Sequence, residues 1–255
     1  MNAEKQLPNS LRQQLRSVIR NAELSPTPLP DCKAIQLWLL AADYPQWQLD
    51  SDEIALLMDK PPYWAFCWAS GQVLAQRIIN HPELVKNKVL LDFGAGSGVV
   101  AIAAKLAGAK QAIICDTDPI AIQACLANAI LNDVTLDIHQ TPSISAQSDS
   151  KCSANLNDHV KPNDKSDLIF DSSLPKADII AMADVFYDKD NLSLLDDMQQ
   201  RYQQVWVADS RLKGATLNNM KIIERQQSHT VPNLDESNEF NMVHLYEREF
   251  NELID

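Results

Sequence analysis

The chain has 255 residues, of which 45% are hydrophobic and 22% charged, as expected for a globular protein able to bury a sizeable core. Its net charge of −12 argues against a broad phosphate-neutralising surface, so we expect neither DNA nor bulk RNA as a partner. Apolar runs stay well short of the ~20 residues that cross a bilayer, so no membrane association is expected.

The five cysteines are odd in number and contain no C-x-x-C pair, which predicts neither a disulfide framework nor a zinc site. The five histidines show no metal-ligand spacing, so no metal is expected. Cysteines of this kind fit a reducing compartment, and the first 25 residues contain no apolar signal segment. These features together predict a cytoplasmic protein.

We expect residues 1–60 to form a helical extension that packs on the core. An amphipathic helix is favoured over a mitochondrial presequence there, because apolar residues recur at helical spacing (Leu7, Leu11, Leu15, Val18 and Ile19). Prolines at positions 26, 28 and 30 separate this helix from the next. The strongly apolar segment 34–42 is expected to contact the core.

Residues 61–255 predict a single α/β domain. After an aromatic loop at 61–68 and a helix ending near Pro82, apolar strands alternate with helices. The expected strands are Val89–Phe93, Gln111–Cys115, Val134–His139, Ala177–Ala183 and Val205–Ala208, with two further β-like stretches at Met220–Glu224 and Met242–Tyr246. The expected helices are Val99–Leu106, Pro119–Leu131 and Asn191–Tyr202. This alternation predicts a doubly wound, mostly parallel seven-stranded sheet. The polar segment 141–166 interrupts it and is predicted to be a disordered insertion.

A glycine cluster carries the central signal of the sequence. The chain has only six glycines, and Gly94, Gly96 and Gly98 follow an apolar strand that ends in Asp92. A dinucleotide fingerprint, G-x-G-x-x-G, would need glycine at position 99, but that residue is Val99. An acid two residues before the first glycine suits a cationic ammonium and would repel a pyrophosphate. The turn therefore predicts a nucleoside that bears an amino acid.

Two acids follow the next strand. Asp116 lies 18 residues after Gly98, where a carboxylate can accept hydrogen bonds from both ribose hydroxyls. Asp118 directly precedes Pro119, the first residue of the following helix. Either acid could instead cap that helix. We favour ribose binding for Asp116, whereas for Asp118 capping and cofactor contact remain close alternatives.

These residues resemble motif I and the acidic strand end of the class I, seven-β-strand S-adenosyl-L-methionine (SAM)-dependent methyltransferases. Residues 61–84, 181–188 and 207–211 resemble, more closely, the electron-transfer-flavoprotein β-subunit lysine methyltransferase group, often described as nicotinamide-methyltransferase-like. Ser70 stands where that group usually has the first glycine of a Gly-Gly-Gln triplet. The resemblance implies a Rossmann-like fold and SAM as cofactor.

The resemblance also suggests further site residues. Asp184 is expected to bind and orient the incoming amine, and Tyr187 to place its ring against the cationic centre; their alternative roles are a helix cap and a core aromatic. Trp64 could line the cofactor pocket or anchor the core. Gly71 could allow close backbone approach or simply ease the start of a helix. Asp167 is the candidate for adenine contact.

The resulting prediction is a SAM-dependent enzyme that transfers a methyl group to a protein lysine. Methylation of a small-molecule amine or of a ribosomal protein stays open, as does a non-catalytic SAM-binding module. A nicotinamide-cofactor reductase is a weaker alternative.

Overall fold

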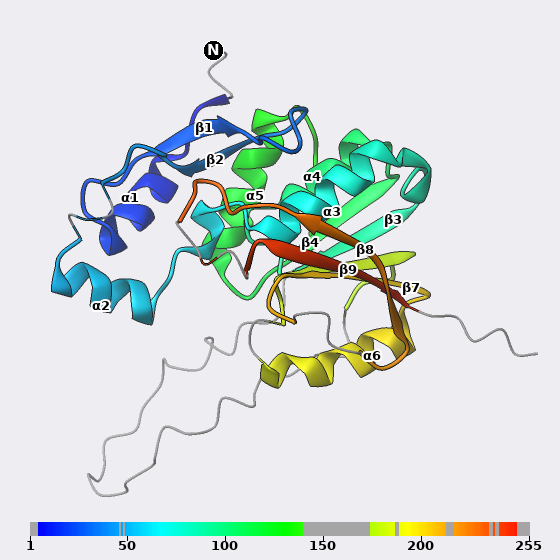
Figure 1. Cartoon of the computed structure of the whole chain (residues 1–255). Helices are drawn as coiled ribbons and strands as arrows, with labels where there is room; N and C mark the ends of the chain where they lie inside the picture. The colour runs from blue at the N-terminus through cyan, green and yellow to red at the C-terminus, as the bar shows by residue number, and fades with distance from the viewer. Residues whose placement is uncertain are drawn as a thin grey trace, which may run out of the picture.

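The computed structural model describes residues 5–45, 47, 49–139, 174–186, 189–212, 217–234, 237 and 240–248. Its centre is a seven-stranded sheet in the order β5-β4-β3-β6-β7-β9-β8 (Figure 1). The strands are β3 (Val89–Phe93), β4 (Gln111–Cys115), β5 (Asp137–His139), β6 (Ile179–Ala183), β7 (Gln204–Asp209), β8 (Met220–Gln227) and β9 (Met242–Arg248). Strands β3 to β7 pair in parallel, and β9 is antiparallel to both of its neighbours. The predicted mostly parallel, seven-stranded sheet is confirmed.

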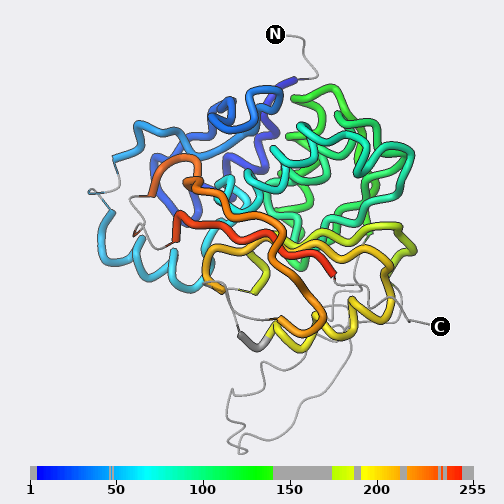
Figure 2. The backbone as a smooth tube through the Cα atoms, turned by 45° about the vertical axis from the view of Figure 1, so that its right-hand side comes forward, coloured from blue at the N-terminus to red at the C-terminus, as the bar shows by residue number. Residues whose placement is uncertain are grey.

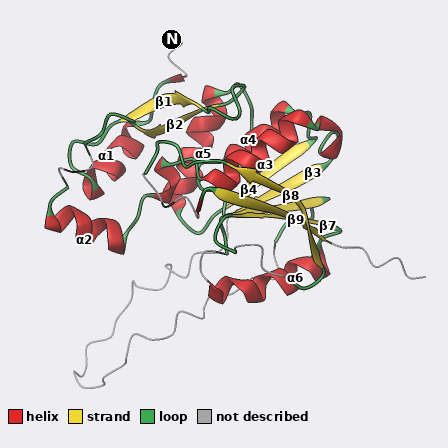
Figure 3. Ribbon diagram, in the orientation of Figure 1, coloured by secondary structure: helices red, strands yellow, loops and turns green. Residues whose placement is uncertain are grey.

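Helices cover both faces of this sheet (Figure 3). One face packs against α3 (Ala69–Asn80), α4 (Val99–Leu106) and α5 (Pro119–Leu131), and the opposite face packs against α6 (Ser193–Arg201). Short 3-10 turns lie at η3 (Tyr63–Ala65), η4 (Pro82–Leu84) and η5 (Lys189–Leu192). The central parallel strands β3, β4, β6 and β7 are buried on both faces and are nearly continuous apolar runs, as is typical of parallel sheets.

The order of the strands fixes where a ligand can bind. From β3 the chain moves outward through β4 to β5, then returns to the other side of β3 and continues through β6 to β7. The strand order therefore reverses between β3 and β6. In doubly wound sheets, ligands bind at this switch point, beyond the carboxyl ends of the strands.

The N-terminal layer differs from the prediction. An antiparallel hairpin, β1 (Leu24–Pro28) and β2 (Gln36–Leu40), lies between α1 (Asn9–Val18) and α2 (Ser51–Asp59), so the expectation of helices throughout 1–60 was wrong. Two prolines occupy β1, which within the described part of the chain pairs with β2 alone. Proline is tolerated on such an edge strand because its missing N–H would face away from the ladder.

The layer nevertheless packs on the core as expected. Leu11 and Leu15 of α1 are fully buried, which confirms the amphipathic helix. Leu37 and Leu39 of β2 join the core of the main sheet, whereas Trp38 and Leu40 face a second cluster shared with α1 and α5. Figure 2 shows the hairpin in blue beside the green α5.

Most other predicted elements agree with the structure. β3, β4, α4 and α5 have the expected bounds, while β5 begins later than expected, at Asp137. The four described cysteines are free and buried. Within the described residues no helix is long and apolar enough to span a membrane. The predicted insertion at 141–166 lies outside the described residues.

Candidate functional site

The glycine turn connects β3 to α4 at the switch point. Gly94, Gly96 and Gly98 have φ values of +71°, +53° and +78°, which L side chains rarely adopt. A Cβ on Gly94 would meet Val185 Cγ2 at 2.9 Å, and one on Gly98 would meet Cys125 atoms from 3.0 Å. A Cβ on Gly96 would find its nearest neighbour only at 4.0 Å. Gly94 and Gly98 therefore allow the turn to pack closely on Val185 and Cys125, while Gly96 borders open space.

Asp116 organises this turn from the end of β4. Its Oδ2 accepts a hydrogen bond from the Gly96 N–H at 2.9 Å, and its Oδ1 accepts one from the Asp118 N–H at 2.9 Å. Burial raises its pKa, and these two N–H donors oppose the rise. The carboxylate is partly exposed, and each oxygen keeps a lone pair. These lone pairs can accept hydrogen bonds from a diol, and ribose binding by Asp116 stays a prediction.

Asp118 and Asp92 both contact helix starts. Asp118 Oδ1 accepts a hydrogen bond from Ile120 N at 2.8 Å, so this residue caps α5, the structural alternative for it. Asp92 is only 2% exposed, and its Oδ2 accepts a hydrogen bond from Ala101 N, in the first turn of α4, at 3.0 Å. Burial raises the pKa of Asp92 to about 8, and the Asp116 charge adds to this. Asp92 therefore lies beneath the turn, and cofactor contact by Asp92 or Asp118 stays a prediction.

Asp184 follows β6, beside the glycine turn. β6 pairs with β3, and Val185, the next residue, is the one against which Gly94 packs. Asp184 has φ +52°, a conformation that costs a non-glycine residue about 1 kcal/mol or more. Strained backbone of this kind is typical of functional sites.

Ser70 holds the Asp184 carboxylate at two points. The Ser70 hydroxyl donates to Oδ1 at 2.6 Å, and the Ser70 N–H donates to Oδ2 at 3.3 Å. Ser70 belongs to the first turn of α3, so Asp184 caps a helix, but not the one that follows it in sequence. Burial raises the pKa of Asp184 to about 7; the Ser70 hydroxyl lowers it and the nearby Asp209 charge raises it. The serine that replaces the usual glycine thus orients the predicted catalytic acid.

The aromatic segment before α3 has two different environments. Trp64 is 3% exposed and packs in the core shared with α1, β2 and α5, which matches the core role considered for it. Trp68 is partly exposed; its Nε1 donates to the Tyr63 carbonyl at 3.1 Å, and its ring lies 5.7 Å from the Tyr63 ring. A Cβ on Gly71 would approach Val99 Cγ1 at 3.0 Å. Gly71 therefore brings α3 close to the start of α4.

Tyr187 and Asp167 lie outside the described residues, so their predicted roles stay predictions. Sequence reasoning assigned no role to Asp209, His244 or Ser70. The first two lie in β7 and β9, paired directly across from each other. Only the Asp209-Ser-Arg turn carried a signal, and it was read as part of a resemblance rather than as a site.

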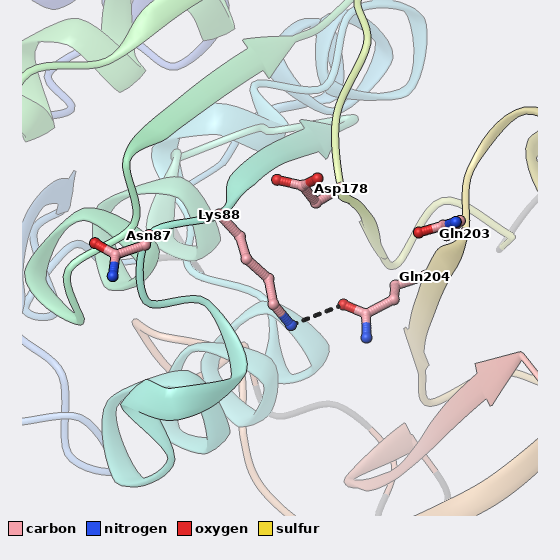
Figure 4. A pocket seen from close by; sticks show the side chains of 5 residues that line it. All are labelled: Asn87, Lys88, Asp178, Gln203 and Gln204. Carbon is pink, nitrogen blue, oxygen red and sulfur yellow. Dashed lines mark hydrogen bonds between the residues drawn. The ribbon is translucent and has the colours of Figure 1, made fainter.

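Two surface hollows differ in position and chemistry. The larger, about 510 Å³, is lined by Asn87, Lys88, Asp178, Gln203 and Gln204, which precede or begin β3, β6 and β7. Figure 4 shows the Lys88 amine donating to Gln204 Oε1 at 3.2 Å across it. It therefore lies at the amino edge of the sheet, opposite the glycine turn.

The smaller hollow, about 270 Å³, is almost wholly apolar and includes Tyr63, Phe66 and Trp68. One of its lining residues, Trp68, stands two residues before Ser70 in the chain. Trp68 directly precedes α3, the helix whose Ser70 contacts Asp184.

The fit of the site to SAM follows from these groups. The site lies at the switch point, where a nucleoside can contact the backbone. Gly96 leaves open space there, and the half-buried Asp116 carboxylate at the end of β4 has lone pairs for further hydrogen bonds. Among the described residues no cluster of histidine, cysteine or acid could hold a metal ion.

The seven-stranded fold and this site are characteristic of the class I, SAM-dependent methyltransferases. Residues 73–170 match the family described as "Ribosomal protein L11 methyltransferase (PrmA)". The chain is 30% identical over 187 residues to "Electron transfer flavoprotein beta subunit lysine methyltransferase homolog" of Caenorhabditis elegans, covering 73% of this chain and 68% of that protein. It is 31% identical over 178 residues to the Mus musculus protein named "Electron transfer flavoprotein beta subunit lysine methyltransferase", covering 70% and 58%. The chain belongs to this family of electron transfer flavoprotein β-subunit lysine methyltransferases.

The match to the relatives is partial. The chain spans 58% of the mouse protein's length and 50% of the rat protein's. Among solved structures, "ribosomal protein L11 methylase" from Lactobacillus delbrueckii subsp. bulgaricus has 20% sequence identity and a TM-score of 0.45, covering 71% of this chain and 79% of that one.

Proposed function

We propose that the chain is a SAM-dependent N-methyltransferase that acts on a protein lysine. The observation that carries the proposal is Asp184, a strained, Ser70-oriented carboxylate beside the glycine turn. The family relatives, named as lysine methyltransferases, support the same acceptor. An electron transfer flavoprotein β subunit is therefore the first substrate to test.

SAM, when bound, supplies an electrophilic methyl group on its sulfonium. The chain's own residues prepare the two ends of the reaction. The glycine turn and Asp116 hold the nucleoside, and Asp184 holds the incoming ammonium at the carboxyl end of β6. Orientation of this kind replaces a costly bimolecular encounter.

The acceptor lysine must release a proton to solvent before its neutral nitrogen can attack. At an unperturbed lysine pKa near 10.4, deprotonation at pH 7 costs about 4.6 kcal/mol. A partly desolvated site lowers this cost because burial disfavours the ammonium. The apolar hollow beside Trp68 provides such surroundings, and its rings could receive the aliphatic part of a lysine side chain.

The decisive experiment combines methyl transfer with cofactor binding. Purified chain is incubated with labelled SAM and electron transfer flavoprotein β subunit, and binding of S-adenosylhomocysteine is measured by calorimetry. We expect Asp184→Ala to abolish transfer while the affinity for S-adenosylhomocysteine changes less than threefold. Asp196→Asn, an exposed acid of α6, is the matched control and should retain full activity. Full activity of Asp184→Ala would contradict the acceptor assignment.

A ribosomal protein is the second candidate substrate, because residues 73–170 match the L11 methyltransferase family. Labelled SAM with cell lysate, followed by mass spectrometry of the labelled species, separates this acceptor and small-molecule amines from the flavoprotein. Tight binding of NAD in place of S-adenosylhomocysteine would refute the methyltransferase proposal. Binding of S-adenosylhomocysteine without any labelled product would favour a non-catalytic module.

Absence of nucleic-acid and membrane partners, and a cytoplasmic location, remain part of the proposal. The charge of −12 and the cysteine usage support them. Cell fractionation, with detection of the chain in the soluble cytoplasmic fraction, tests the location.

A further inference from the structure

Asp209 ends β7 next to Asp184. In the parallel pairing of β6 with β7, Ala183 is the partner of Ala208, and the Asp184 N–H donates to the Ala208 carbonyl at 3.0 Å. The two acids therefore follow equivalent positions on neighbouring strands. Asp209 is fully buried, whereas Asp184 is partly exposed, and the Asp209 charge raises the pKa of Asp184, so the two acids lie near each other with Asp209 the more buried.

The Asp209 carboxylate is only half used by the described residues. Its Oδ1 accepts hydrogen bonds from Arg211 N at 2.7 Å and Leu212 N at 2.9 Å. Its Oδ2 is buried and has no hydrogen-bond partner among the described residues. Burial raises the pKa of Asp209, and the backbone N–H groups of Arg211, Leu212 and Phe186, together with the Arg211 charge, oppose this. A buried oxygen without a donor is costly to a fold unless something else supplies one.

His244 provides the independent observation. It is the cross-strand partner of Asp209 in β9, it is 9% exposed, and its Nδ1 is buried without a hydrogen-bond partner among the described residues. Directly opposed residues of an antiparallel pair have side chains on the same face. Burial and the Arg225 charge lower the pKa of His244 below its ordinary value of 6.5, with the Asp209 charge opposing the shift, so the ring is neutral near pH 7. An unused carboxylate oxygen and an unused ring nitrogen thus share one face.

The chemistry of these groups selects one class of ligand. A phosphate or carboxylate would be repelled by two acids, and an apolar group would leave Oδ2 without a donor. A primary ammonium carries three donors and no acceptor, which matches two carboxylates and a neutral imidazole. The Arg211 charge lowers the pKa of both acids, and its guanidinium carbon lies 4.5 Å from the centre of the Phe240 ring. Asp209 Oδ2 nevertheless has no hydrogen-bond partner among the described residues, so Arg211 does not supply the missing donor.

We propose that Asp209 and His244 complete, with Asp184, a binding site for a primary ammonium group. Under the proposed function, on which this inference rests, that group is the ε-ammonium of the acceptor lysine. The entering ammonium contacts Asp184 first, and hydrogen bonds to Asp209 and His244 then set how deeply it is buried. The site selects a cation on a slender chain over a neutral group of the same size.

The test uses full-length chain saturated with S-adenosylhomocysteine. n-Butylamine, which carries the ammonium on a lysine-length chain, and 1-butanol, its neutral counterpart, are titrated calorimetrically. We expect wild type to bind n-butylamine with at least tenfold preference over 1-butanol. Asp209→Asn should weaken n-butylamine binding at least tenfold. Asp178→Asn is the matched control, because Asp178 lies at the opposite edge of the same sheet, and it should stay within twofold of wild type.

A second variant guards against misfolding. His244→Leu keeps the volume of the side chain, removes both ring nitrogens, and should weaken n-butylamine binding at least threefold. Circular dichroism and S-adenosylhomocysteine affinity verify folding of each variant. Equal binding of n-butylamine and 1-butanol to wild type, or unchanged n-butylamine binding in folded Asp209→Asn or His244→Leu, would overturn the inference. Failure of wild type to bind S-adenosylhomocysteine would instead overturn the proposed function.

Discussion

Asp92 is a buried carboxyl group with a raised pKa, and it predicts how stability depends on pH. Burial raises its pKa to about 8 from an ordinary value of 3.8. Between these two values the folded chain holds a proton that the unfolded chain releases. Stability from this group is therefore complete below about pH 4 and is lost as pH rises through 8.

The size of the effect follows from the same values. One pKa unit corresponds to about 1.4 kcal/mol, so this single group reduces the free energy of unfolding by about 4 kcal/mol between pH 5 and pH 8. Asp92→Asn retains an oxygen that can accept from Ala101 N but has no proton to lose. The variant should therefore gain about 4 kcal/mol relative to wild type over that interval.

Urea unfolding followed by circular dichroism, at half-unit steps from pH 5 to pH 8, measures the difference. Asp184, Asp116 and Asp209 also have raised pKa values, so wild-type stability should fall with pH from several sources. Those sources are common to both proteins, and the difference between the two curves isolates Asp92. Parallel curves would refute the reasoning, because they would show that Asp92 is ionised in the fold throughout this range.

Three further predictions concern the surroundings of the site. Gly98→Ala should destabilise the fold by about 2–4 kcal/mol, since it combines a positive φ with a Cβ clash at 3.0 Å. Gly108→Ala has a similar φ but a nearest neighbour at 3.8 Å, so it should cost only about 1–2 kcal/mol; equal losses in urea unfolding would contradict the packing role. Asn128→Ala should cost about 2–4 kcal/mol, because it leaves two buried backbone groups of the hairpin and the glycine turn unpaired. The same change at the more exposed Asn132 should cost about 1 kcal/mol in the same assay. Ser70→Ala removes the hydroxyl that lowers the pKa of the Asp184 carboxyl group, so the acid limb of the pH profile of kcat/KM should move to higher pH. Ser70→Thr should restore the wild-type profile. An unchanged acid limb in Ser70→Ala would exclude this positioning role.

The parts of the fold that could be predicted are those set by local patterns. β3, the glycine turn and α4 form one contiguous stretch, in which an apolar run, three glycines and a second apolar run each specify their own backbone. The same holds for β4 and α5, where Pro119 and the preceding Asp118 mark the helix start. In such segments sequence and tertiary structure favour the same conformation.

The hairpin was missed because its signals conflict. Two prolines in β1 suggest a break between helices, and the apolar run in β2 does not by itself distinguish a buried strand from a buried helix. Pairing across Leu24 and Leu40, together with burial on both faces of β2, decides the outcome. Both are tertiary contacts, which no local pattern reports.

Long-range partners account for what was missed at the site. Ser70 and Asp184 are 114 residues apart, and the sequence showed only that serine replaces a usual glycine. Asp209 and His244 meet through an antiparallel pairing whose register was not predicted. Trp64 was equally suited to a pocket or a core, and only its position against α1 and α5 settles that it is buried.

The acids of the site share an arrangement that explains how a fold can keep several of them in one place. Asp92, Asp118 and Asp184 each accept a hydrogen bond from the first turn of a helix, where the helix dipole and free N–H groups stabilise negative charge. Asp116 and Asp209 are held instead by turn N–H groups. Backbone donors thus contribute to orienting all five acids, with the Ser70 hydroxyl added at Asp184 and the Arg211 charge acting on Asp184 and Asp209. Asp92 holds its proton near pH 7, so the acids beside the turn that can attract a bound sulfonium or ammonium are Asp116, Asp184 and Asp209.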